Sequence, residues 1–147
     1  MKQNSAAHYA LKHTQQTLSP EIVTALNEKA VAGRISCAAV HAIAVSFKLS
    51  PSVVGVQADL LEIRLTRCIL GLFGYEREKQ GTRKNLDQHV SISPQLEEAI
   101  VQQAKDNRLS CLECWDIAKN LHMRRSHVSS ACEKMGIKIK PCQLGAF

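Results

Sequence analysis

The sequence predicts a mostly α-helical protein of two tandem repeats, each with three helices and one C-terminal strand, related by a pseudo-twofold axis. Three observations lead to this fold class. Segment 17–73 aligns without a gap on segment 91–147, and 16 of the 57 aligned positions are identical, whereas chance gives roughly one identity in sixteen. The core is aliphatic, because only 4% of the residues are aromatic while 45% are hydrophobic. Serine precedes most of the periodic apolar segments, as at helix N-termini.

The first helix of each repeat begins at a Ser-Pro pair. Ser19 and Ser93 suit the N-cap, and Pro20 and Pro94 suit the first helical position, where the missing N–H has no helical partner. Apolar residues at helical spacing follow in both repeats. They are Ile22, Leu26, Leu96 and Ile100. The spacing predicts a helix of about ten residues in each repeat.

Two further helices and a strand complete each repeat. The second helix is expected from Ser36 to about residue 47 and from Ser110 to about residue 121. Short breaks separate it from a third helix, which ends near residues 61 and 135. Segments 63–65 and 137–139 then alternate apolar and charged residues, which is typical of a half-buried strand. The inner helix face in repeat 1 is expected to carry Val40, Ile43, Ala44, Phe47, Val54, Ala58 and Leu61.

Outside the repeats, two polar segments remain. Segment 1–16 is a polar leader, and segment 74–90 is a charged connector that is too long for a tight turn. The expected organisation is therefore leader 1–16, repeat 1 over 17–73, connector 74–90 and repeat 2 over 91–147.

The second and third helices carry a pattern that appears twice. In repeat 2, Ile117-Ala118 is followed by Leu121, Met123, Ser126 and Val128. This pattern resembles the helix-turn-helix of bacterial DNA-binding regulators. The small alanine lets two helices cross closely, and apolar residues in the turn and in the next helix close a small core. Repeat 1 carries the same spacing in Ile43, Ala44, Phe47, Leu49, Ser52 and Val54.

With its trailing strand, each repeat is similar to a winged-helix domain with a reduced wing. The turn departs from the family pattern, because Lys48 and His122 stand where glycine is usual. The resemblance implies that residues at the start of the third helix enter the major groove of DNA. In repeat 2 these residues are Arg124, Arg125, Ser126, His127, Ser129 and Ser130.

The two repeats differ in what they offer to DNA. Arginine pairs with guanine in a bidentate contact, and serine bonds bases or phosphates. Repeat 1 has no cation in its third helix, and Val53 and Val56 are apolar there. We therefore expect double-stranded DNA to bind repeat 2, in a transcriptional regulator. The alternative is a helix-turn-helix interaction or assembly scaffold without DNA affinity, which would bind a protein partner through repeat 1.

Composition narrows the function class. The net charge of +6 favours an anionic partner. The absence of a long apolar run or an apolar N-terminal segment predicts a cytoplasmic protein without a membrane partner. The chain has no Gly-rich phosphate loop, no GxSxG and no HExxH. We therefore expect no enzyme activity and no cofactor.

Six cysteines leave three alternatives open. Buried packing is the simplest. A metal site is the second, with candidates Cys37, Cys68, Cys111 and Cys142, which occupy matched positions in the two repeats. A redox switch is the third, because Cys37 and Cys111 lie at predicted helix N-termini, where the helix dipole lowers a thiol pKa. We expect packing and no bound metal.

Overall fold

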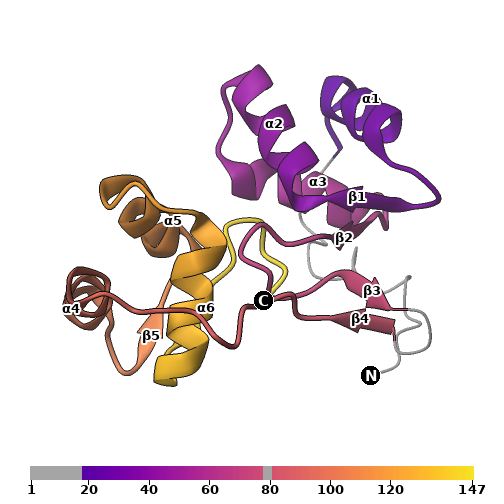
Figure 1. The fold of residues 1–147 in the computed structure, drawn as a ribbon. Helices are drawn as coiled ribbons and strands as arrows, with labels where there is room; N and C mark the ends of the chain where they lie inside the picture. The colour runs from indigo at the N-terminus through magenta and orange to yellow at the C-terminus, as the bar shows by residue number, and fades with distance from the viewer. Residues whose placement is uncertain (1–17, 78–80) are drawn as a thin grey trace. The chain divides into compact units, whose positions relative to one another are not determined.

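The computed structural model describes residues 18–77 and 81–147, and the leader 1–16 lies outside them. Helices predominate, with six in the described residues (Figure 1). The chain divides into two compact units. Unit 1 comprises the residues up to Arg67 together with Leu144–Ala146, and unit 2 comprises Cys68–Gln143 together with Phe147. The division falls earlier than the expected end of repeat 1 at residue 73.

Unit 1 contains α1 (Pro20–Lys29), β1 (Arg34–Ser36), α2 (Cys37–Phe47), α3 (Pro51–Leu60) and β2 (Arg64–Thr66). Unit 2 contains α4 (Pro94–Gln103), β5 (Arg108–Leu109), α5 (Cys111–Asn120), α6 (Arg125–Met135) and β6 (Lys138–Ile139). The same order of elements therefore occurs in both units, and each helix of unit 2 begins 74 residues after its counterpart. Both predicted C-terminal strands are present.

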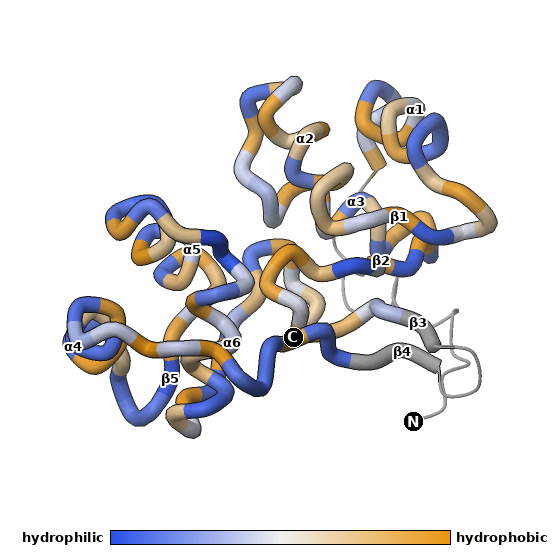
Figure 2. Tube along the Cα trace, in the orientation of Figure 1, coloured by the Kyte–Doolittle hydropathy of each residue, from blue (hydrophilic) through white to orange (hydrophobic). Residues whose placement is uncertain are grey.

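The serine caps form at three of the four expected positions. The hydroxyl oxygens of Ser36 and Ser93 accept from the backbone N–H three residues on, and Ser110 forms a capping box with Glu113. Ser19 stands at the N-cap of α1 without a side-chain cap bond. Its backbone N–H instead donates to Gln57 Oε1 at 2.8 Å. α1 and α4 each carry hydrophobic and hydrophilic residues (Figure 2). The buried residues Ile22, Leu26, Leu96 and Ile100 lie at the predicted helical spacing.

Each C-terminal strand pairs in a way that the sequence did not predict. β1 pairs with β2 in parallel, and β5 pairs with β6 in parallel. The pairing is parallel because a helical pair lies between the two strands and returns the chain to the same edge. A further antiparallel hairpin, β3 (Tyr75–Arg77) with β4 (Gly81–Arg83), lies within the expected connector and belongs to unit 2.

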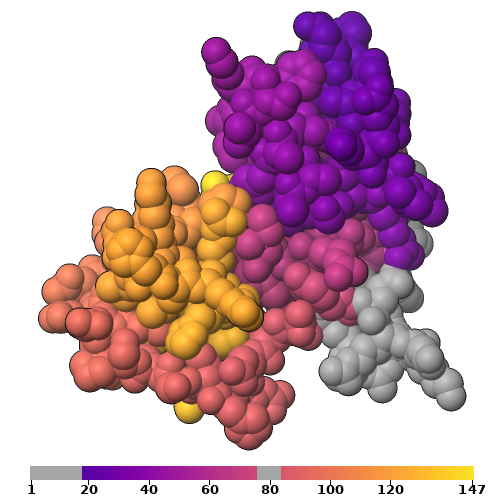
Figure 3. All heavy atoms as spheres, turned by 45° about the horizontal axis from the view of Figure 1, so that its top comes forward, coloured from indigo at the N-terminus to yellow at the C-terminus, as the bar shows by residue number. Residues whose placement is uncertain are grey.

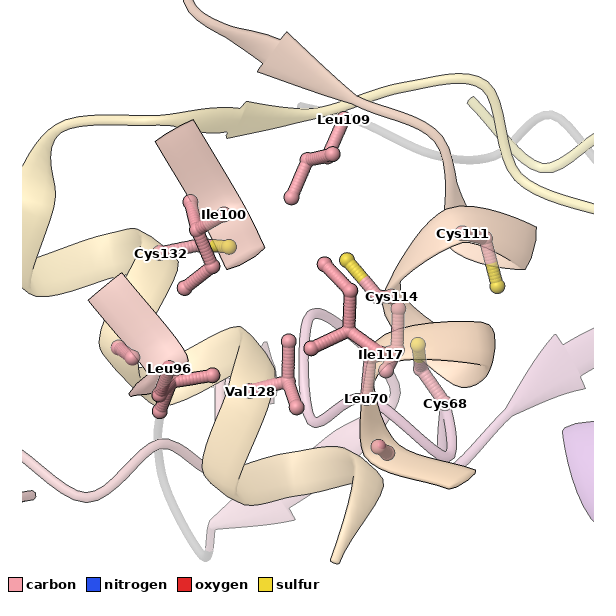
Figure 4. Close-up of a cluster of buried hydrophobic side chains, with 12 residues drawn as sticks. Cys68, Leu70, Leu96, Ile100, Leu109, Cys111, Cys114, Ile117, Val128 and Cys132 are labelled. Carbon is pink, nitrogen blue, oxygen red and sulfur yellow. The ribbon is translucent and has the colours of Figure 1, made fainter. Parts of the chain in front are cut away.

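The buried cores follow the predicted inner faces except at Phe47 in α2 and at Leu61, which is the half-buried C-cap of α3. Ile43, Ala44 and Val54 of unit 1 are buried, as are their counterparts in unit 2. Phe47 was expected on the inner face and is instead exposed. In unit 2 the helices bury a cluster that includes three cysteines of the helices themselves, Cys111, Cys114 and Cys132 (Figure 4).

Candidate nucleic-acid interface

The two helix pairs that the sequence predicts as helix-turn-helix elements are α2 with α3 and α5 with α6. α2 and α3 are joined by three residues and meet at a bend of 119°, within the range of about 90–120° for this motif. The backbone N–H groups of Leu49 and Met123 donate to Ala44 and Ala118 at 2.9 and 3.0 Å. Each turn therefore bonds back to the small alanine that the pattern contains.

The turn positions that usually carry glycine adopt the conformation that glycine would favour. Lys48 has a φ of 57° and His122 a φ of 55°. Both lie in the left-handed region, which costs a non-glycine residue about 1 kcal/mol or more. Although Lys48 and His122 replace glycine, the backbone of each turn therefore keeps the left-handed conformation that glycine would adopt.

Arg124 and Arg125 stand at the beginning of α6, where the resemblance placed the DNA contacts. Arg124 is the N-cap and Arg125 is the first helical residue, and both side chains are exposed. The Arg125 guanidinium carbon lies 3.9 Å from the centroid of the Trp115 ring on α5. This cation–π contact restricts the Arg125 side chain, which remains exposed to solvent.

A third cation extends this surface. Lys119 is exposed on α5, and it lines a surface depression together with Trp115, Arg124 and Arg125. We refer to Lys119, Arg124 and Arg125 as the basic face of unit 2. Asp116 also lines the depression and contributes one negative charge. The α5–α6 segment, drawn in orange, reaches the molecular surface in Figure 3.

Sequence reasoning missed Trp115 and Lys119 as parts of this surface. Their separation of four residues on a predicted helix was the available signal, because residues i and i+4 share a helix face. What the spacing did not reveal is which face of α5 turns toward Arg125.

Ser126 and His127 are half-buried beside the arginines. The His127 Nε2 atom lies 2.9 Å from the Ser91 carbonyl oxygen, which orients the ring. His127 therefore has a fixed position next to the basic face, with one ring nitrogen already engaged.

Ser129 and Ser130 are not at the surface, contrary to the expectation that they contact DNA. Both are buried. The Ser129 hydroxyl donates to the Leu70 carbonyl, and the Ser130 hydroxyl accepts from the Asp87 backbone N–H at 2.9 Å. Both side chains lie on the inner face of α6 and are hydrogen-bonded within unit 2. We therefore remove them from the candidate DNA contacts.

The corresponding surface of unit 1 carries both polar and large apolar side chains. Lys48, Ser50 and Ser52 are exposed there, while Gln57 is buried and Gly55 faces a backbone segment. Large hydrophobic side chains are exposed around the α2–α3 turn. They are Val45, Phe47, Leu49 and Val53, with exposed fractions of 78, 38, 36 and 41%. Unit 1 therefore exposes large apolar side chains at the helix pair that corresponds to the basic face of unit 2.

The cysteines are mainly packing residues, and none forms a disulfide. Cys142 is half-buried and the other five are buried. Within the described part of the chain, no three side chains of His, Cys, Asp or Glu gather closely enough to hold a metal ion.

The lowered thiol pKa that the redox-switch alternative requires is not found at Cys111. Burial raises the pKa of the Cys111 thiol, and also that of Cys68. In the core, Cys114 and Cys132 share a hydrogen bond that raises the pKa of Cys114 and lowers that of Cys132. Loss of water around the thiolate is the largest cause of the raised pKa at Cys111.

The chain matches no protein-family model, no curated protein and no solved structure. Among the described helices, none is by itself long and apolar enough to cross a membrane. α2 and α3 together have the length and composition, but the 119° bend separates them.

Proposed function

We propose that this protein binds double-stranded DNA as a transcriptional regulator, with α6 as its recognition helix. The observation that carries the proposal is the placement of Arg124 and Arg125. They are adjacent, exposed and at the N-terminus of the second helix of a helix-turn-helix element, where that motif contacts base edges.

The side chains suit distinct roles in such a complex. Arg125, supported by Trp115, presents a guanidinium with restricted freedom, which lowers the entropy lost on binding. Arg124 is the better candidate for a flexible contact to guanine or phosphate. Lys119 suits a phosphate, and Ser126 and His127 suit contacts at the edge of the footprint.

The proposal includes a duplicated architecture in which the two units are repeats related by a pseudo-twofold axis. Two contacts support it. In unit 2, Leu70 packs against α6 and its carbonyl accepts from Ser129. In unit 1, the carbonyl of Leu144 lies against Gly55 of α3. Leu144 follows Leu70 by 74 residues and Ser129 follows Gly55 by 74 residues, so residues at matched positions are in contact in each unit.

The remaining parts of the proposal follow from this function. The chain acts in the cytoplasm, needs no cofactor and is not an enzyme. Its interaction partner is DNA, and no membrane is involved.

The test is a salt series of duplex binding, with random and genomic DNA, on a variant that combines Arg124→Ala and Arg125→Ala. Each lost bidentate contact costs about 1–3 kcal/mol, and each 1.4 kcal/mol is about tenfold in affinity. We therefore expect at least about a 30-fold loss. Binding by the unchanged protein should fall steeply with salt.

The matched control removes two other exposed cations of unit 2, in a Lys105→Ala, Arg108→Ala variant. Both variants lose the same charge, so a general electrostatic effect would weaken both equally. Equal losses in the two variants would contradict a recognition role for α6.

A second candidate function is a protein-interaction scaffold that docks through unit 1. The exposed apolar side chains around the α2–α3 turn favour it, because a DNA-reading surface is polar and basic. The same salt series separates the two functions. A scaffold of this kind would show no salt-dependent affinity for duplex DNA.

A further inference from the structure

Cys111 and Cys142 are brought together by hydrogen bonds on both sides of Cys142. The Cys111 backbone N–H donates to the Pro141 carbonyl at 3.0 Å. The Gln143 Nε2 atom donates to the Cys111 sulfur at 3.3 Å. The residues directly before and after Cys142 therefore both bond to Cys111.

The strand pairing of unit 2 sets this arrangement. Leu109 of β5 is in register with Ile139 of β6, and the Lys140 backbone N–H donates to Leu109 at 2.7 Å. Neighbouring strands lie about 4.7–4.9 Å apart, and disulfides join Cα atoms about 4.4–6.8 Å apart. Cys111 is the first residue of α5 and lies two residues past β5, and Cys142 lies three residues past β6. The hydrogen bond from the Cys111 N–H to the Pro141 carbonyl places the backbone of Cys111 beside the peptide unit that joins Pro141 to Cys142.

The two thiols differ in access to solvent. Cys142 is half-buried, whereas Cys111 is buried. Burial raises the pKa of the Cys111 thiol, and the hydrogen bond from Gln143 acts in the opposite direction by favouring its thiolate. A reagent in solution therefore meets Cys142 first, and Cys111 responds within the protein.

We propose that Cys142 and Cys111 form a dithiol site that is modified by low-molecular-weight disulfides. The Cys142 thiolate attacks a sulfur of the reagent, forms a mixed disulfide and releases one small thiolate. Cys111 then loses its proton, attacks the Cys142 sulfur and displaces the second small thiolate. Two protein thiols are oxidised to one disulfide, and one reagent disulfide is reduced to two thiols.

Gln143 is the positioning residue for the second step. Its N–H group already faces the Cys111 sulfur, where negative charge develops when that thiol is deprotonated. Cys68 is also near, because charges on Cys142 and on Cys68 both raise the pKa of the Cys111 thiol. Figure 4 shows Cys68 in the neighbourhood of Cys111. Cys68 is as buried as Cys111, and its sulfur is hydrogen-bonded to the backbone of residues 70–72, so we expect it to remain a thiol while Cys142 and Cys111 react.

The test treats the full chain with glutathione disulfide without oxygen, and follows intact mass and disulfide-linked peptides over time. We expect a transient single glutathione adduct and then a loss of two hydrogens, with the bond mapped between Cys111 and Cys142. The Cys111→Ser variant should accumulate the adduct on Cys142. The Cys142→Ser variant should form neither species, and Gln143→Ala should slow only the second step.

The matched control is Cys68→Ser, which should behave like the unchanged protein. Circular dichroism confirms that each variant is folded, and Cys111→Ala replaces the serine variant if that one does not fold. A bond mapped to another pair, a stable adduct on the unchanged protein, or a requirement for Cys68 would overturn the proposal. None of these readouts depends on DNA binding.

Discussion

Gly55→Ala should destabilise unit 1, although alanine is the better helix former. Gly55 lies inside α3, where alanine is favoured by about 1 kcal/mol over glycine. A Cβ at this position would lie 2.3 Å from the Leu144 carbonyl oxygen and 3.0 Å from its carbon. Both are backbone atoms, so the segment Leu144–Ala146 has to move as a whole.

That movement would expose Leu144, which is now almost fully buried, with an exposed fraction of 2%. Burying a leucine side chain contributes about 1.5–3 kcal/mol, and overpacking adds about 1–3 kcal/mol. After the gain in helix propensity, we expect a net loss of about 1.5–5 kcal/mol in the free energy of unfolding. Urea denaturation followed by circular dichroism measures this difference.

The Leu144→Ala variant provides the companion measurement, with an expected loss of about 2–5 kcal/mol. Because both changes act on the same contact, the double variant should lose less free energy of unfolding than the sum of the two single losses. Ser52→Ala on exposed α3 surface is the control and should stay within about 0.5 kcal/mol. A stabilised Gly55→Ala protein, or strict additivity with Leu144→Ala, would refute the close contact.

Two further predictions concern the turns and the thiols. Replacing Lys48 or His122 by glycine should raise the free energy of unfolding by up to about 1 kcal/mol, because their left-handed φ is strained for other residues; unchanged or lower stability in urea would contradict this strain. Burial raises the pKa of Cys68 and Cys111 in the folded state, so the folded protein keeps protons that the unfolded chain loses. Their contribution to the free energy of unfolding should therefore be fully present below the ordinary thiol pKa of about 8.5 and should fall as the pH rises above it. In urea denaturation from pH 7 to 10, the free energy of unfolding of a Cys68→Ala variant should fall less steeply than that of the unchanged protein. An equally steep fall would contradict the role of the buried thiol.

Local structure was largely predictable from short segments of the chain. Ser-Pro pairs and apolar spacing located α1 and α4, and the alternating segments located β2 and β6. These elements depend on caps and on side chains three or four residues apart, which the sequence displays directly. The order of the three helices in each unit and the position of Arg124 and Arg125 at the start of α6 follow from the same local rules.

The surface roles of other residues required the tertiary fold. Ser129 and Ser130 have the composition of a DNA contact, but the Leu70 carbonyl and the Asp87 N–H take their hydroxyls into the core of unit 2. No local pattern specifies such partners, because they come from segments 43 or more residues away along the chain.

By itself, the sequence determined the helices, the two trailing strands, the 74-residue repetition and the difference in charge between the two third helices. Only the tertiary structure decided that β1 and β5 pair with those strands in parallel, that Leu144 packs on Gly55, and that Cys142 lies beside Cys111. The reason is physical. Caps and periodicity act over a few residues, whereas these contacts depend on how the chain returns after a helical pair and on which buried surfaces remain to be filled.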